Sequence, residues 1–445
     1  MTANIHYYDI GDHKTRKEKL DTLRLFKSAE NVPWTIITPN SKHDWINQRS
    51  REFDSLVPMI SRHETAVFEM LSNGLKTGRD RWCYNFSLQK LTENMQRMIA
   101  FYNEQVREFQ KQKIADHDLT VSRFITYDRQ KISWDSELQN SVKRGISIPF
   151  QHQSLTSAMY RPFCKMHVYF NRHVNQRTYQ MARIFPMENS AICIPASGAF
   201  CCFMTDTLPD LGLLPAAKCF PYWVYDVNKE PGSMCQENAE WPRRENITDT
   251  AWKLFQKHYH NNGITKSDIF YYVYGVLHAP EYRQKFQNEL KKQLPRIPLV
   301  RGVKLFRRFS EAGKKLADLH VHYETGKKYP LKQNNDNTGN TAVVKMKFAS
   351  ATDKSKIIYN NAVTISGIPD EAHRYLINGR SALDWLLDRY QIKKDKNSGI
   401  VNDPNDRLRE LHSPQYIIEL IQRVVFLSTE SVKIIEGLPE FGNMI

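Results

Sequence analysis

A stretch in the middle of the chain combines residue types that can read DNA bases. Residues 151–187 hold five Lys and Arg and no Asp or Glu, with aromatic and amide side chains between the basic ones. In the major groove arginine pairs with guanine through two hydrogen bonds, and asparagine or glutamine pairs with adenine in the same way. The alternative stays open that these side chains bind phosphates or hold strands together, since phosphate contacts are commoner than base contacts. The candidates for base readout are Arg161, Lys165, Arg172, Asn175, Gln176, Arg177 and Arg183.

A second concentration of positive charge lies further along the chain. Residues 243–328 hold 18 Lys and Arg against 8 Asp and Glu, which is ten of the fifteen excess positive charges of the whole chain. Leu290 to Ser310 contain seven basic residues and no acidic one. Such a run is often only a solvated surface, but this concentration favours contact with phosphates. The candidates for phosphate contact are Lys291, Lys292, Arg296, Arg301, Lys304, Arg307 and Arg308.

Motifs that would complete a reaction are missing. The sequence has no G-x-x-x-x-G-K-S/T loop for ATP, no glycine-rich loop for a nucleotide-like cofactor, no G-x-S-x-G elbow and no H-E-x-x-H helix. Asn402 to Asn405 superficially resembles an N-P-P-Y box, but it lacks the second proline and the aromatic residue, so a polar turn is the better interpretation. We therefore expect no catalytic residues and no cofactor in this chain.

A metal site is not expected either. Cys164 and His167 lie three residues apart, with His173 beyond, but four ligands at accepted zinc spacing are missing, and the adjacent Cys201 and Cys202 disfavour one tetrahedral ion. The cysteines are better interpreted as small buried apolar residues. The paired histidines are expected at the surface or in helix caps; they are His258, His260, His320 and His322.

The overall charge and composition point to nucleic acid. A net charge of +15 favours an anionic partner. No apolar stretch approaches the roughly 20 residues that a membrane span needs, so nucleic acid is favoured over lipid. The seven cysteines have no CxxC spacing and no signal peptide is recognisable, which predicts a reduced, cytoplasmic protein.

Hydrophobic spacing predicts the elements that position these residues. In the first half we expect helices over Lys14–Phe26 and Ser87–Lys113, the second with an apolar stripe from Leu88 to Phe109. We also expect a buried strand over Val32–Pro39 and a β-rich part with several short strands. Those strands are Phe124–Tyr127, His167–Phe170, Ala191–Pro195 and Phe200–Met204.

The second half is predicted to be mainly helical. Thr265 and Asp268 form a helix start signal, a second helix runs from Pro280 to Pro295, and a third begins near Val303. A polar linker over Asn334–Asn340 precedes a β-hairpin made by Ala342–Phe348 and Lys356–Ile365, and two helices close the chain.

At 445 residues the chain is long for a single core. We expect an α+β protein with a mixed β-rich recognition region, a helical subdomain, and a C-terminal β-hairpin with helices. The predicted segments are 1–114, 115–245 (β-rich DNA recognition), 246–333 (basic helical subdomain) and 334–445 (C-terminal hairpin and helices).

Several short stretches, in order along the chain, carry a resemblance. The chain resembles the C-terminal part of type ISP restriction-modification enzymes, which are single-polypeptide, ATP-dependent restriction enzymes. The stretches are Tyr7–Asp12, Asp44–Arg49, Thr77–Trp82, Tyr160–Phe163, Asp268–Gly275, Asn378–Trp385 and Asp403–Asn405.

The resemblance implies a nuclease, a helicase-like motor, an adenine-N6 methyltransferase and then a target-recognition domain, of which this chain corresponds to the last. S-adenosylmethionine, ATP and Mg are then expected only in the other domains. The implied partners are double-stranded DNA and those methyltransferase, helicase and nuclease domains, in the same parent chain or as a separate subunit, in the cytoplasm of a bacterium.

The resemblance also implies that segment 1–114 is the methyltransferase-junction segment, and it places residues 77–82 near that junction. Arg79 and Arg81 are therefore further candidates for phosphate contact, or they pair with Asp80 and Glu69 in a structural network. A second hypothesis makes the chain an interaction subunit, in which apolar N-terminal residues dock a separate methyltransferase and DNA contact is secondary; they include Ile10, Leu20 and Trp34.

Overall fold

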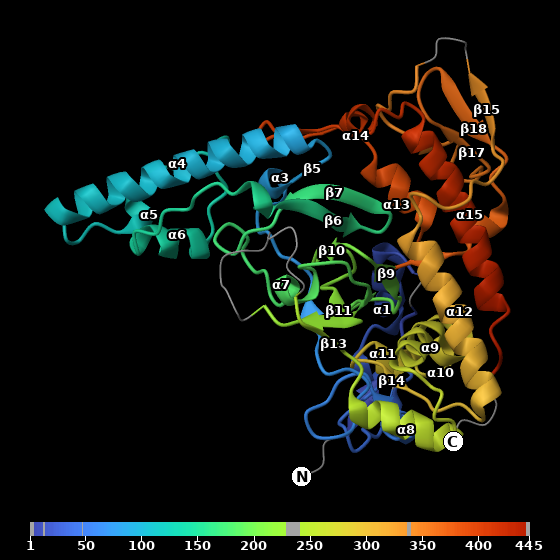
Figure 1. The fold of residues 1–445 in the computed structure, drawn as a ribbon. Coiled ribbons are helices and arrows are strands. Elements are labelled where there is room, and N and C mark those ends of the chain that lie inside the picture. The colour runs from blue at the N-terminus through green and yellow to red at the C-terminus, as the bar shows by residue number, and fades with distance from the viewer. Residues whose placement is uncertain (1–3, 12–13, 47, 228–240, 336–339, 442–445) are drawn as a thin grey trace.

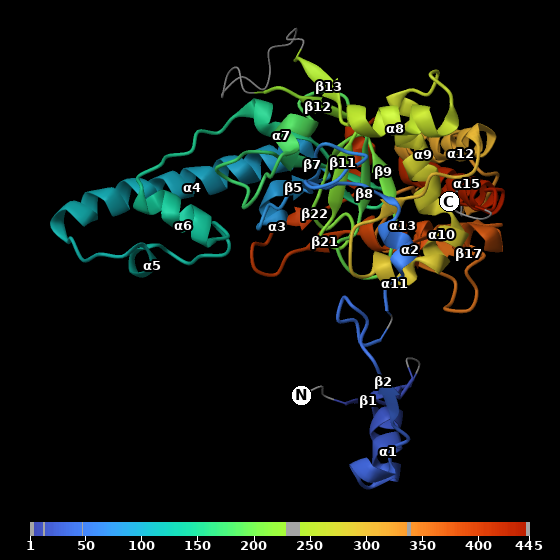
Figure 2. The same ribbon diagram turned by 90° about the horizontal axis from the view of Figure 1, so that it is seen from below.

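The fold was analysed in a computed structural model that describes residues 4–11, 14–46, 48–227, 241–335 and 340–441. A body of small sheets and helices carries a helical arm on one side (Figure 1). A small N-terminal unit extends away from the body in another direction (Figure 2). The fold is α+β, as the sequence predicts.

The N-terminal unit consists of two strands and one helix. β1 (Ile5–Tyr7) pairs antiparallel with β2 (Thr35–Ile37), and α1 (Arg16–Phe26) lies between them in sequence. Thr15 and Glu18 form a capping box at the start of α1, which confirms the predicted helix. A strand is present within the predicted range Val32–Pro39, as β2, but the prediction that it is buried is wrong. β2 is short and exposed because it pairs only with β1, away from the body (Figure 2).

The arm is built on α4 (Leu88–Ala115), against which α6 (Ser136–Lys143) packs. At 1.5 Å per residue its 28 residues span about 42 Å. The predicted stripe is buried from Leu91 to Phe109, whereas Leu88 is partly exposed. The strand predicted over Phe124–Tyr127 is wrong. Residues up to Phe124 form one turn of helix, α5 (Val121–Phe124). The Thr126 carbonyl accepts a hydrogen bond from the indole N–H of Trp134 (3.0 Å) and not from a neighbouring strand.

Two four-stranded sheets form the centre of the body. The first has the order β10-β6-β7-β5, with β6 and β7 joined as a hairpin, and the second has the order β4-β11-β8-β9. The predicted strands near His167, Ala191 and Met204 are confirmed as β7, β8 and β9. The bounds in the first sheet are β5 (Tyr84–Asn85), β6 (Leu155–Arg161), β7 (Cys164–Tyr169) and β10 (Leu208–Pro209). Those in the second are β4 (Ser72–Asn73), β8 (Ala191–Ile194), β9 (Phe203–Thr205) and β11 (Lys218–Pro221).

The second sheet separates two cores, because successive side chains of a strand point to opposite faces. In β8, Ala191 and Cys193 join a cluster that contains the arm and the C-terminal helices, whereas Ile192 and Ile194 join a cluster built on the helices of residues 249–321. Short elements complete this part. They are α2 (Arg51–Asp54), β3 (Val57–Pro58), α3 (Asp80–Cys83), α7 (Met181–Ile184), β12 (Trp223–Tyr225), β13 (Arg243–Glu245) and β14 (Arg296–Ile297).

The helical part is held together by the crossing of α9 (Lys266–His278) and α12 (Val303–Val321). Gly275 and Gly313 lie at this crossing, and a Cβ on Gly313 would overlap the Tyr271 carbonyl oxygen. The predicted start of α9 is confirmed, since Thr265 and Asp268 form a capping box. Also in this part are α8 (Asp249–Tyr259), α10 (Pro280–Lys285) and α11 (Gln287–Leu290).

Two predictions for this part are wrong. The single helix expected from Pro280 to Pro295 is broken into α10 and α11 at Phe286, which leaves helical geometry and buries its ring against Phe53. His320 is not at the surface. It is fully buried, with Nδ1 2.6 Å from the Tyr274 hydroxyl and Nε2 3.2 Å from Ser431 Oγ, and burial lowers its pKa to about 3.

The described residues of the C-terminal part form a four-stranded sheet of order β15-β18-β17-β16, two two-stranded sheets, β19-β20 and β21-β22, and three α-helices. The predicted hairpin is confirmed as β16 and β17, but residues 356–365 form two strands because Asn360 Oδ1 accepts from the Val363 amide in a tight turn (2.7 Å). Of the predicted linker, residues 336–339 lie outside the described residues. The strands are β15 (Lys332–Asn335), β16 (Lys347–Phe348), β17 (Lys356–Ile358), β18 (Val363–Ser366), β19 (Leu376–Ile377), β20 (Arg380–Ser381), β21 (Lys393–Lys394) and β22 (Val401–Asn402). The helices are α13 (Ala382–Arg389), α14 (Asn405–Glu410) and α15 (Tyr416–Glu436).

The predicted division into four segments stays a prediction. Within the described ranges, no helix combines the length and the apolar character that crossing a membrane would require.

Candidate nucleic-acid interface

Arg161, the first candidate for base readout, lies inside the fold. It ends β6, and its Nη1 donates to Asp210 Oδ1 (2.7 Å), while its guanidinium lies over the Tyr160 ring at 3.9 Å. Asp210 also accepts from the Tyr84 hydroxyl (2.8 Å) and from the Gly212 amide (2.7 Å). Burial raises the pKa of Asp210 to about 6, although the Arg161 guanidinium opposes the rise. In this geometry Arg161 joins β6 to the loop that follows β10.

Three other candidates from the same stretch are also held within the protein. Lys165 lies between Asp206 (3.2 Å) and Glu324 (3.4 Å). Asn175 is buried, accepts from the Asn171 amide (2.8 Å) and donates to the Tyr169 carbonyl (3.1 Å). Arg183, in α7, is partly buried.

The remaining three candidates are at or near the surface of the loop after β7. Arg172 and Arg177 are exposed, and Gln176 is partly exposed. Arg177 pairs with Glu137 of α6 (2.8 Å), which brings this loop against the base of the arm. The structure therefore divides the stretch into buried side chains that hold strands and loops and a short surface loop that carries Arg172, Gln176 and Arg177, of which Arg177 is held in an exposed ion pair.

Arg79 and Arg81 differ sharply in their surroundings. The Arg79 side chain is 1% exposed; its Nη2 pairs with Asp135 (2.8 Å) and its Nε donates to the Ser133 carbonyl (3.1 Å). Arg81 is about half exposed and lies 3.5 Å from Asp395. Asp80 belongs to an internal network with Thr77, Tyr160 and Arg161. The structural network expected for residues 77–82 therefore exists, but the arginines pair with Asp135 and Asp395 and not with Asp80 and Glu69. Glu69 pairs with Arg244 instead (2.7 Å).

A cavity of about 660 Å³ opens beside Arg81, where the arm meets the body. Its walls come from three segments far apart in sequence, residues 78–82, 127–139 and 395–398. Gly78, which lines the cavity, has φ +69°, and a Cβ there would lie 2.9 Å from the Gln176 side chain. The cavity is thus next to the surface loop that carries Arg172, Gln176 and Arg177. Figure 2 shows α3, α5 and β21 on the side of the body from which the N-terminal unit extends.

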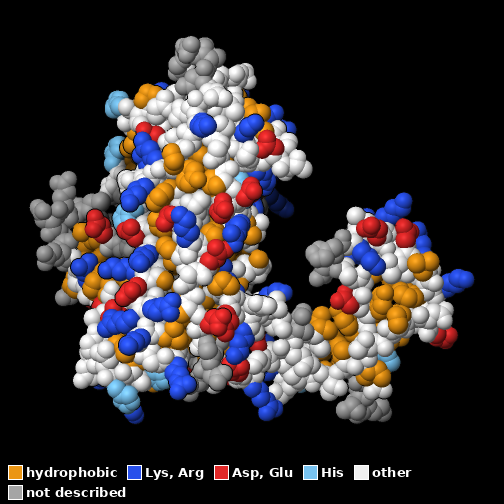
Figure 3. Space-filling model, turned by 90° about the vertical axis from the view of Figure 1, so that its right-hand side faces the viewer, with side chains coloured by type: hydrophobic (Ala, Val, Ile, Leu, Met, Phe, Trp, Pro, Cys, Tyr) orange, Lys and Arg blue, Asp and Glu red, His pale blue; other side chains and the backbone are white. Residues whose placement is uncertain are grey.

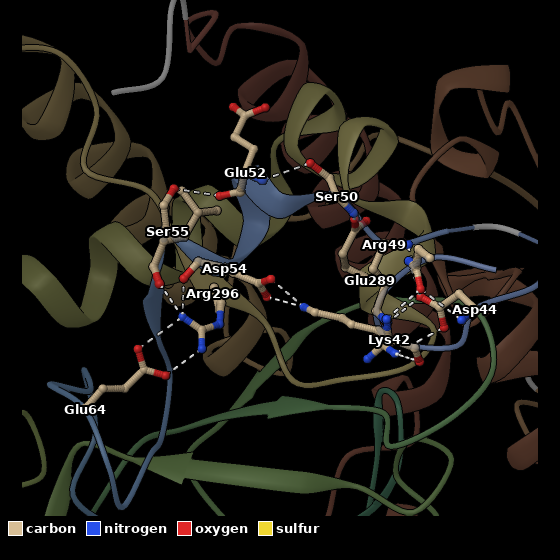
Figure 4. A network of polar contacts seen from close by, with 12 residues as sticks. Lys42, Asp44, Arg49, Ser50, Glu52, Asp54, Ser55, Glu64, Glu289 and Arg296 are labelled. Carbon is tan, nitrogen blue, oxygen red and sulfur yellow. Dashed lines mark hydrogen bonds and ion pairs between the residues drawn. The ribbon is translucent and has the colours of Figure 1, made fainter. Parts of the chain in front are cut away.

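The basic run at 291–308 is partly used to anchor the segment that leads to the N-terminal unit (Figure 4). Lys292 pairs with Asp44 (2.9 Å), and Arg296 pairs with Glu64 and donates to the Leu56 carbonyl (2.8 Å). The hydrogen bond from Arg49 holds the pKa of Asp44 well below its usual range.

The other members of the run fall into one paired residue and four exposed residues. Arg307 pairs with Asp268 (2.8 Å). Lys291, Arg301, Lys304 and Arg308 are exposed and form no ion pair with any other described residue. These four, unlike the paired three, have charges available to an external phosphate.

Sequence reasoning missed Tyr127, Arg129 and Asp395 as members of the same surface. Tyr127 falls in a predicted strand, Arg129 lies outside the basic runs, and Asp395 is a single acid among Lys393, Lys394 and Lys396. Only their convergence on one cavity distinguishes them, and no local pattern carries that information.

Nothing in the described part of the chain is arranged as a metal centre. No three His, Cys, Asp or Glu side chains there are grouped closely enough to hold an ion. The six described cysteines are buried and unpaired, in keeping with their interpretation as small apolar residues; Cys235 lies outside the described residues.

Comparison with known proteins gives a consistent family match. The chain matches the family model described as Type ISP C-terminal specificity domain over residues 66–420. No curated protein sequence matches it significantly. Among solved structures, it is similar to a nuclease-deletion mutant of the Type ISP restriction-modification enzyme LlaGI in complex with a DNA substrate mimic. The TM-score is 0.86 and the sequence identity is 34%, and the match covers 98% of this chain and 39% of that chain.

Two further structures give similar values. The ATP-dependent Type ISP restriction-modification enzyme LlaBIII bound to DNA has a TM-score of 0.86 and 31% identity over 98% of this chain and 28% of that chain. The DrdV–DNA complex has a TM-score of 0.82 and 29% identity over 98% of this chain and 43% of that chain. The chain therefore spans less than half the length of each of these three proteins.

Proposed function

Because the chain belongs to the Type ISP C-terminal specificity domain family, we propose that it binds double-stranded DNA at a specific sequence. It holds that duplex for an adenine-N6 methyltransferase and a nuclease located outside these residues, in a restriction-modification system that defends against phage. The observation that carries this proposal is the likeness, at 34% identity over 98% of this chain, to an enzyme whose structure holds a DNA substrate mimic.

The described surface supports a division of labour in this binding. The loop after β7 presents Arg172, Gln176 and Arg177, residue types that pair with guanine and adenine edges. Lys291, Arg301, Lys304 and Arg308 offer exposed charges to phosphates, which fix position without reading sequence. A methyltransferase must extrude its target base from the stack, so another element has to keep the duplex in register.

The chain is proposed to be non-catalytic by itself. Its sequence has no P-loop and no cofactor loop, so S-adenosylmethionine, ATP and Mg are assigned to the other domains. Calorimetry of the purified chain with S-adenosylmethionine tests this assignment, and tight binding would contradict it.

The central test is duplex binding by the purified chain. Selection from a pool of random duplexes should enrich a defined sequence, and affinity for that sequence should fall steeply with salt because bound cations are released from DNA. Arg172→Gln and Arg177→Gln should lower the ratio of specific to non-specific affinity. Lys304→Gln and Arg308→Gln should weaken binding to all sequences alike. If no duplex binds even at low salt, the proposal fails.

A second candidate function rests on the N-terminal unit, which extends from the body and displays apolar side chains (Figure 3). Leu25 is 80% and Ile36 66% exposed, and Leu20 and Trp34 are also exposed, whereas Ile10 is half-buried. A two-stranded sheet is marginally stable by itself, which favours a protein partner such as the methyltransferase on this unit. Leu25→Gln with Ile36→Gln should abolish capture of a co-expressed methyltransferase and leave DNA affinity unchanged. Unaltered capture would contradict this docking surface.

A further inference from the structure

The cavity where the arm meets the body has a rigid base. Arg79 and Asp135 form a buried ion pair beneath it, and Arg79 also donates to the Ser133 carbonyl. These contacts join residues 77–79 to the arm segment that carries Trp134. A site held by buried contacts keeps its shape before a ligand arrives, which reduces the cost of binding.

Two arginines at this cavity keep hydrogen-bonding capacity for a ligand. Arg81 Nε lies 3.5 Å from the Asp395 carboxylate, and the guanidinium forms no hydrogen bond with any other described residue. Arg129 is exposed and forms neither a hydrogen bond nor an ion pair in the described part of the chain. The planar fork of arginine matches the geometry of a phosphate group, and Asp395 helps to orient one of the two forks.

An exposed aromatic ring accompanies the arginines. Tyr127 lines the cavity and is 59% exposed, beside the half-buried Trp134, whose indole N–H is held by the Thr126 carbonyl. Aromatic side chains beside basic ones offer an apolar face in nucleic-acid sites, on which bases commonly stack. The cavity therefore offers both charged and apolar contacts.

The surroundings favour a long ligand over a small free one. The cavity lies at the base of an arm whose main helix is about 42 Å long, which corresponds to about 12 base-pair steps of 3.4 Å. It also adjoins the loop with Arg172, Gln176 and Arg177 through the contact between Gly78 and Gln176. A duplex that presents base edges to this loop would therefore also pass close to the cavity.

We propose that this cavity clamps the sugar-phosphate backbone of one DNA strand, with Arg81 and Arg129 donating to phosphate oxygens and Tyr127 packing against the sugar. This inference rests on the proposed function and adds to it the place where one strand is held. It also assigns roles to Tyr127, Arg129 and Asp395.

The test uses the full chain and the duplex selected above, with dissociation constants measured from low to high salt. Each arginine that contacts a phosphate contributes about 0.9 to the slope of log affinity against log salt. Arg81→Gln and Arg129→Gln should each reduce the slope by about 0.9, the double variant by about 1.8, and the ratio of specific to non-specific affinity should not change. Tyr127→Ser should weaken binding at every salt concentration without changing the slope.

Lys257→Gln is the matched control, since it removes one exposed positive charge from α8, on another part of the body, and Lys257 forms no ion pair with a residue that the structure describes. It should leave the slope unchanged. Melting temperatures check folding, and Arg81→Gln should melt as wild type because its partly exposed pair contributes little.

The outcomes separate the two proposals. If the wild type binds duplex DNA and the arginine variants keep its slope, the clamp is wrong and the proposed function stands. If the wild type binds no duplex, both are wrong. A rise in 2-aminopurine fluorescence on binding that Tyr127→Ser abolishes would place an unstacked base in the cavity and overturn the backbone assignment.

Discussion

Replacing Arg161 by methionine should destabilise the protein and leave its DNA sequence preference unchanged. Arg161 is 18% exposed and pairs with Asp210, whose side chain is 5% exposed, so the substitution leaves a buried carboxylate without its cation. Removing one partner of a buried pair costs about 3–5 kcal/mol. At about 2 °C per kcal/mol for a large domain, the melting temperature should fall by roughly 6–10 °C.

The pH dependence of this loss follows from the pKa of Asp210. That pKa is already raised to about 6 by burial, and removing Arg161 takes away the charge that opposes the rise. In the variant the pKa of Asp210 therefore lies higher than in wild type, and below that higher pKa the carboxyl is protonated and needs no cation. The difference in melting temperature between variant and wild type should therefore be largest near pH 7.5. The corresponding difference in the free energy of unfolding should shrink as pH falls, by up to about 1.4 kcal/mol for each pH unit.

A double-mutant cycle isolates the pair. Asp210→Asn should cost less than Arg161→Met, because Arg161 keeps its contact with the Tyr160 ring and some exposure to water. The double variant should be more stable than the sum of the two single losses predicts, by about 1–3 kcal/mol. Differential scanning calorimetry of the four proteins measures this coupling.

Arg172→Met is the control, since Arg172 is an exposed arginine of the same stretch. It should melt as wild type and lower the ratio of specific to non-specific affinity. The reasoning about Arg161 is refuted if Arg161→Met melts as wild type and that ratio falls tenfold, because Arg161 would then read a base.

Three further predictions concern the stability of the body. Gly313→Ala should lower the free energy of unfolding by about 3 kcal/mol, because the new Cβ would lie 2.7 Å from the Gly275 amide nitrogen. Calorimetry measures this loss against Lys314→Ala, a substitution at the neighbouring exposed position. Equal melting temperatures of the two variants would contradict a tight crossing of α9 and α12. His320 has its pKa lowered to about 3 by burial, below the value near 6.5 of an unfolded chain, so the stability present above pH 6.5 is lost as pH falls. Between pH 6.5 and pH 4 the free energy of unfolding should fall by about 3 kcal/mol more in wild type than in His320→Gln. Equal falls in the two proteins would refute a neutral buried imidazole. Asp135→Asn should lower the free energy of unfolding by about 3–5 kcal/mol, because it leaves Arg79 buried and unpaired. Glu137→Gln removes a partner from an exposed ion pair and should lower it by under about 1 kcal/mol. Similar melting temperatures of the two variants would contradict the buried pair.

Local sequence was sufficient for the long helices α4, α9 and α12, for the hairpin and for the family, although it did not predict the break between α10 and α11. The apolar stripe of α4 and the capping boxes of α1 and α9 depend on residues three or four positions apart, so the pattern is complete within one segment. Ordered motifs along the chain likewise indicated the type ISP family, which the family match over residues 66–420 confirms.

Which charges are available to DNA was decided only by the tertiary structure. Arg161 and Arg172 belong to one basic stretch, but Arg161 meets Asp210 and is held inside, whereas Arg172 stays exposed. Arg81 meets Asp395, more than 300 residues away. The free energy of an ion pair depends on distance and burial in space, and neither is a function of separation along the chain. Composition could therefore place positive charge in a region, but only packing could separate the buried arginines from those left to bind a phosphate.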